Sequence, residues 1–145
     1  MKQKYFLIMG LLGIIVFISG CVKQTPPETA VTALLDNSFQ LKINQTAFIE
    51  SENLKIKFLN VTEDSRCPSD VVCVWGGQVT VVVNVLKNNK NRGDFNLTSR
   101  AAQGEMAIKN LERDSIKLIK VEPYPKTTPK IELSDYNIIL IVFKI

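Results

Sequence analysis

The chain has 145 residues, 46% hydrophobic and 22% charged, a composition that suits one small globular domain. Its formal net charge of +4 includes Lys2 and Lys4, and the remainder, at +2 and without a run of like charges, gives no support for nucleic-acid binding. The chain contains no histidine, which excludes Ser-His-Asp and Cys-His catalysis within it and any zinc site built on imidazole.

The first twenty residues are predicted to be a secretory signal peptide. A short basic start is followed by an uncharged apolar stretch, residues 5–18, and then by small residues. Fourteen apolar residues are fewer than the roughly 20 of a membrane-spanning helix. An uncleaved signal anchor over residues 5–22 is the alternative interpretation.

Ile18-Ser19-Gly20-Cys21 ends this segment and resembles the lipobox of bacterial lipoproteins, although Leu is more usual than Ile at the first position. The resemblance implies that the signal is cut before Cys21 and that the Cys21 thiol carries a lipid. It also implies that the protein is held by this lipid on the extracytoplasmic face of a cell membrane or outer membrane.

Residues 21–37 follow the lipobox and contain two prolines, three threonines and few bulky side chains before Leu34. This composition predicts a tether between the membrane and a folded domain over residues 38–145. Within the tether, residues 30–35 are compatible with either a helical turn or an added edge strand.

From residue 38 onward, apolar residues alternate with polar ones, which predicts half-buried strands. The alternating residues are Phe39, Leu41, Ile43, Leu54, Ile56, Phe58, Val79, Val81, Val83, Val85, Phe95 and Leu97. Residues 88–94 are predicted to be a hairpin loop, and Gly104 to mark a turn before Met106, Ile108 and Leu111.

Two more stretches favour strands at the C-terminal end. Residues 116–121 are rich in β-branched side chains and are closed by Pro123 and Pro125. Residues 136–145 are apolar at nearly every position, which predicts a central strand covered on both faces. Seven or eight short strands indicate an all-β fold, either a small antiparallel sandwich or a barrel.

The segment EDSRCPSDVVCVWGG, residues 63–77, holds Cys67 and Cys73. With Cys21 lipidated, two cysteines remain in an oxidising compartment, and a Cys67–Cys73 disulfide is the simplest prediction. Such a bond closes a loop of seven residues, which contributes about 2.4 kcal/mol in the chain-entropy model.

Metal and redox chemistry fit this segment poorly. Two thiols without an imidazole do not complete a structural zinc site, and the spacing of Glu63, Asp64 and Asp70 fits no known calcium loop. Five residues between the cysteines also differ from the Cys-x-x-Cys of redox proteins. We therefore expect neither a metal nor another cofactor.

Trp75 has two interpretations. In the first, which we favour, it packs over the disulfide at the edge of the core. In the second, Trp75 is an exposed anchor for a partner, together with Tyr124 and Arg66. Arg66 has a structural alternative, since it can pair with Asp64.

The signature Asp64-Ser65-Arg66-Cys67-Pro68 followed by Cys73-Val74-Trp75-Gly76-Gly77 is similar to one seen in small uncharacterised bacterial lipoproteins and secreted proteins. This resemblance implies no activity for the chain. We expect a membrane-anchored binding or structural module that is not an enzyme, with an envelope protein as a possible partner. The alternatives are a small cell-envelope hydrolase, for which no motif is present, and an inhibitor-like module that presents residues 67–73.

Overall fold

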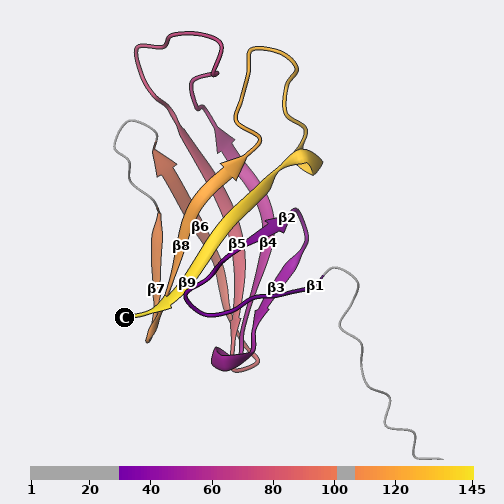
Figure 1. Ribbon diagram of the computed structural model, residues 1–145, viewed down its shortest axis with the longest axis vertical. Coiled ribbons are helices and arrows are strands. Elements are labelled where there is room, and N and C mark those ends of the chain that lie inside the picture. The colour runs from indigo at the N-terminus through magenta and orange to yellow at the C-terminus, as the bar shows by residue number, and fades with distance from the viewer. Residues whose placement is uncertain (1–29, 101–106) are drawn as a thin grey trace, which may run out of the picture.

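The computed structural model describes residues 30–100 and 107–145 (Figure 1). These residues form nine β-strands and two short 3-10 helices, at Glu50–Glu52 and Leu133–Asp135. The strands are β1 (Ala30–Thr32), β2 (Ser38–Lys42), β3 (Thr46–Ile49), β4 (Leu54–Asp64), β5 (Gln78–Lys87), β6 (Lys90–Arg100), β7 (Ile108–Leu111), β8 (Asp114–Glu122) and β9 (Asn137–Lys144). The predictions for the signal peptide, Cys21, Gly104 and Met106 lie outside the described residues.

The strands form two sheets. One has the order β1-β3-β4-β5-β6 and the other the order β2-β9-β8-β7. Every neighbouring pair is antiparallel except β1 and β3, which are parallel. The predicted all-β fold is confirmed, and of its two architectures the chain adopts the sandwich (Figure 1). The described residues hold nine strands rather than seven or eight because β1 and β3 are short strands that the alternation does not reveal.

Most of the alternating residues form the core between the sheets, as predicted, whereas Ile43 and Phe95 are only partly buried against it. Leu54, Ile56 and Phe58 of β4 and Val81, Val83 and Val85 of β5 are all fully buried. From the opposite sheet, β8 and β9 contribute Ile116, Leu118, Ile138, Leu140 and Val142. Burial of these side chains is the main favourable contribution to folding, at about 1.5–3 kcal/mol for each large one.

Strand β9 is central in its sheet, as predicted, since it pairs with β2 on one side and with β8 on the other. Its burial alternates strictly, so Ile138, Leu140 and Val142 face the core while Ile139 and Ile141 are only partly covered. The prediction that both faces are covered is therefore wrong. The outer isoleucines are partly exposed because no further layer of the described residues lies over this sheet.

Two other predictions need correction. The loop predicted over residues 88–94 is a two-residue turn, in which Asn88 and Asn89 both have positive φ, and β6 starts directly after it. Residues 30–32, in the predicted tether, form β1 at the edge of the larger sheet, so the folded domain begins before residue 38. Of the two alternatives for this segment, the edge strand is the one found.

At the end of the sandwich that holds the 88–89 turn, buried charges join the sheets. The ammonium group of Lys87 on β5 lies 2.5 Å from Asp114 on β8 and 3.3 Å from Glu52. Glu52 also pairs with Lys144 of β9 at 2.8 Å. These ion pairs link β5 to the strands of the other sheet.

Candidate binding surface

Two loops lie side by side at the opposite end of the sandwich (Figure 1). Residues 65–77 join β4 to β5 and residues 123–136 join β8 to β9, so each loop belongs to a different sheet. The Ser69 amide donates to the Pro125 carbonyl oxygen at 2.9 Å. Asp70 accepts hydrogen bonds from the backbone amide and the hydroxyl of Thr127 at 3.0 and 2.5 Å. The two loops therefore form one surface, here called the tip.

The first loop is closed by a disulfide bond between Cys67 and Cys73, which confirms the predicted pairing. The Cys67 amide also donates to the Gly76 carbonyl oxygen at 3.1 Å. Gly77, with φ of +69°, then turns the chain into β5, a backbone conformation that suits glycine. These constraints fix both ends of the segment that contains the two cysteines and Trp75.

Arg66 lies beneath the loop and is buried, with 7% of its surface exposed. It forms a bidentate pair with Asp64, through Nε at 2.8 Å and Nη2 at 2.6 Å. Its Nη1 and Nη2 atoms also donate to the carbonyl oxygens of Val121 and Pro123 at 2.7 and 3.0 Å. Since Arg66 uses its donors inside the protein, it does not belong to the predicted surface contacts, and its structural alternative is confirmed.

The same network reaches β9 through Tyr136, whose hydroxyl donates to Asp64 at 2.9 Å. Burial raises the pKa of Asp64, but the hydrogen bonds from Arg66 and Tyr136 and the charge of Arg66 outweigh it, and the pKa lies below its usual value. Burial and the hydrogen bond to Asp64 raise the pKa of Tyr136 to about 12. Asp64 is therefore held as a carboxylate and Tyr136 as a neutral hydrogen-bond donor at neutral pH.

Above this network, the loop presents apolar side chains to solvent. Trp75 is 82% exposed, Val74 92% and Val72 102%, and Val71 is also exposed. The favoured prediction that Trp75 packs over the disulfide is wrong, and the alternative of an exposed side chain describes its position. Large exposed apolar groups that lie together on a small domain indicate an interaction site.

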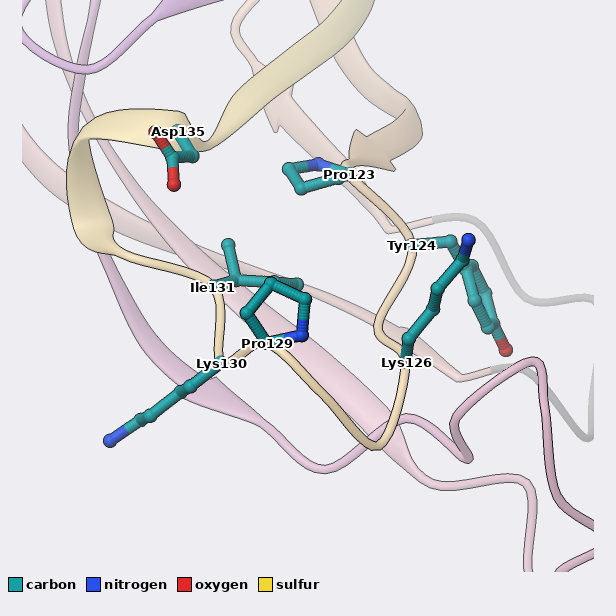
Figure 2. A pocket seen from close by; sticks show the side chains of 7 residues that line it. All are labelled: Pro123, Tyr124, Lys126, Pro129, Lys130, Ile131 and Asp135. Atoms are coloured by element: carbon teal, nitrogen blue, oxygen red, sulfur yellow. The ribbon is translucent and has the colours of Figure 1, made fainter.

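Tyr124 is partly exposed at the edge of the tip, and its ring centre lies 4.9 Å from the guanidinium carbon of Arg66. It also lines a pocket of about 200 Å³ inside the second loop. Figure 2 shows the pocket walls on two legs of that loop. The lining residues are Pro123, Tyr124, Lys126, Pro129, Lys130, Ile131 and Asp135. The sequence singled out Tyr124 because prolines flank it on both sides. It gave no signal for the pocket, because the two legs of the loop come together only when the chain folds.

The carboxylates that were considered for calcium do not converge. Asp64 faces Arg66 and Tyr136, whereas Asp70 is bonded to Thr127. In the part of the chain that the structure describes, no three Cys, Asp or Glu side chains form a group that fits a metal ion. Over the same residues, no helix has the length and apolar character needed to cross a membrane.

Comparison of the chain with family models, with curated proteins and with solved structures found no match.

Proposed function

We propose that this chain is a bacterial lipoprotein, anchored through a lipid on Cys21, whose extracytoplasmic β-sandwich is a binding module. The support for the anchor is the sequence Ile18-Ser19-Gly20-Cys21 at the end of an apolar segment preceded by basic residues. The contact surface of the module is the tip, and an envelope component is its partner.

We choose the tip as the contact surface because Val72, Val74 and Trp75 are exposed there. Exposed apolar side chains gain free energy when a partner removes them from water, at about 25 cal/mol per Å². The disulfide and the bonds to the second loop hold the loop ends before a partner arrives, which lowers the entropy cost of ordering the loop on binding. Tryptophan is also among the residues that dominate binding energy at interfaces.

The first test concerns the anchor. Intact-mass measurement of protein extracted from membranes is expected to show loss of residues 1–20 and an added acyl mass on Cys21. A mature chain that still contains residues 1–20, or an unmodified Cys21, contradicts the anchor. Replacement of Cys21 by Ser is the matched control and is expected to remove the acyl mass.

The second test concerns the contact surface. A photoreactive benzophenone side chain at position 72, activated in cells, is expected to form a crosslinked product that mass spectrometry identifies. The same side chain at Lys90, exposed beside the turn at the other end of the sandwich, is the control. Equal crosslinking from both positions contradicts the assignment of the tip, whatever the result for Cys21.

A further inference from the structure

Residues 71–77, VVCVWGG, contain no charged side chain, and five of them are exposed. Entry of this segment into the boundary region of a bilayer therefore carries no cost of charge desolvation from its own side chains. Tryptophan has its highest frequency at that boundary, because its ring is apolar and its N–H group still reaches water. The composition of the loop is thus suited to a lipid surface.

The second loop carries charges of both signs beside this apolar segment, because Glu132 and Asp135 are exposed there as well as two lysines. Lys126 and Lys130 are exposed there, and Figure 2 shows the Lys130 side chain directed away from the pocket. Lysines at this level are suited to the phosphates of lipid headgroups while neighbouring apolar groups lie deeper. Tyr124, between the loops, adds a second amphipathic ring.

The length of the N-terminal segment brings the tip within reach of the membrane. Nine residues, 21–29, separate the proposed lipid on Cys21 from Ala30, and they span at most about 30 Å. Through its neighbours in the sheet, Ala30 lies level with Asn84 of β5, about 17 Å of strand from Val79 at the tip end. The segment is therefore long enough for Cys21 to lie beyond the end of the sheet, by up to about 13 Å, on the side of the tip.

The direction of β1 favours the same end. β1 runs parallel to β3 and antiparallel to β4, and β4 ends at the tip loop. Ala30 is therefore the residue of β1 nearest to the tip, and the chain from Cys21 joins β1 at that end of the strand.

From these observations we propose that residues 71–75 insert into the interfacial layer of the bilayer that holds the Cys21 lipid. This proposal rests on the proposed function, because it requires the anchor and names the partner of the tip. The loop is a second attachment, which fixes the orientation of the sandwich on the membrane. An apolar cleft of an envelope protein is the competing partner.

Trp75 is the single tryptophan of the chain, so its fluorescence reports on the loop alone. The lipidated full-length mature protein is incorporated into vesicles of phosphatidylcholine and phosphatidylglycerol, with or without lipids brominated near the headgroup. We expect a blue-shifted emission and a loss of about two-fold or more with the brominated lipids, since bromine quenches only at contact. Soluble iodide is expected to quench Trp75 less in vesicles than in protein freed of its lipid.

Two variants sharpen the test. V72D/V74D places charges on fully exposed side chains, so the fold is unaffected and the lipid still holds the protein on the vesicle. In this variant we expect quenching by brominated lipid to disappear. I108D puts one such charge on an exposed apolar residue of β7, and quenching is expected to persist.

The outcomes separate the two proposals. If Cys21 is acylated but brominated lipid leaves the emission unchanged, the insertion is wrong and the anchor stands. If the emission responds only to added envelope proteins, the partner is a protein and the insertion is equally wrong. If Cys21 carries no lipid, both proposals fall.

Discussion

Gly77 shows how one residue sets the path of the tip loop. Its φ of +69° is rarely adopted by residues with a side chain, and a Cβ built there lies 1.8 Å from the Ser65 carbonyl oxygen. The oxygen belongs to the backbone of a loop that is held by hydrogen bonds on both sides, so it has little freedom to withdraw. Gly77 is therefore required both by conformation and by space.

Replacement of Gly77 by Ala is expected to lower the free energy of unfolding by more than about 2 kcal/mol, because backbone strain and a steric clash add. Gly93→Ala is the matched control, since Gly93 has φ of +97° but nothing within 4 Å of an added Cβ. The control is expected to cost only the strain of about 1–2 kcal/mol. Urea unfolding followed by circular dichroism measures both, and equal losses contradict the role of the clash.

Two aspartates, one at the end of β4 and one in the tip, differ in what they hold in place. Asp64 pairs with a buried arginine, whereas Asp70 is an exposed partner of Thr127. Loss of the charge on Asp64 leaves the guanidinium of Arg66 buried without its counter-ion, which costs far more than loss of an exposed hydrogen bond.

We expect Asp64→Asn to reduce the free energy of unfolding by about 3 kcal/mol or more, and Asp70→Asn to reduce it far less. Thermal or urea unfolding of both variants measures the difference. Similar losses in the two variants would show that the Asp64–Arg66 pair does not organise the tip. The comparison is informative because the two residues lie only six positions apart in the same segment.

At the level of strands and loops, the sequence predicted the elements whose burial follows a period of two. β4 and β5 were found because Leu54, Ile56 and Phe58 and the alternating valines must all face one side of a sheet. β1 has only three residues and no strict alternation, and its pairing with β3 depends on segments far along the chain. The 88–89 turn was predicted too long because β6 begins with polar residues at a sheet edge.

The candidate site was predicted in part for similar reasons. The disulfide follows from cysteine count and compartment, which are local properties of the sequence. The burial of Arg66 depends on contacts far along the chain, with the carbonyl oxygens of Val121 at the end of β8 and Pro123 at the start of the second loop. No pattern near residue 66 reveals that an acceptor lies 55 residues away.

For the molecule as a whole, buried charges connect the two sheets at both ends of the sandwich. Asp64, Arg66 and Tyr136 do so at the tip, and Lys87 with Asp114 does so at the other end. Asp114 is completely buried, and one of its carboxylate oxygens has no hydrogen-bond partner among the described residues. Burial lowers the pKa of Lys87, but its bonds to Asp114 and Glu52 outweigh this and leave the pKa above its usual value. Both connections therefore contain a hydrogen-bonded pair of opposite charges, Asp64 with Arg66 and Lys87 with Asp114.

The lowered pKa of Asp64 makes the whole domain sensitive to acid. Its carboxylate contributes stability that is fully present above the unfolded pKa, near 3.8, and is lost as the pH falls through the lower folded pKa. Glu52, whose pKa is lowered first by its hydrogen bond from Lys144, acts in the same direction. We expect the urea midpoint to fall as the pH is lowered below about 4, because the folded state then takes up protons only by weakening these pairs.

The raised pKa of Tyr136 predicts a second loss of stability, at alkaline pH. Its folded pKa of about 12 lies above the ordinary value of 10.0, so its contribution is complete below pH 10 and is lost as the pH rises through about 12. Tyr136→Phe is expected to be less stable at neutral pH and to lose less additional stability between about pH 10 and 12 than the parent chain. Asp64→Asn is expected to lose less stability than the parent chain as the pH falls below about 4. The part of that loss that comes from Glu52 is expected to remain. Urea midpoints measured across the pH range for the three proteins test this, and acid and alkaline limbs that are identical in all three would show that the Asp64–Arg66–Tyr136 network does not join the sheets.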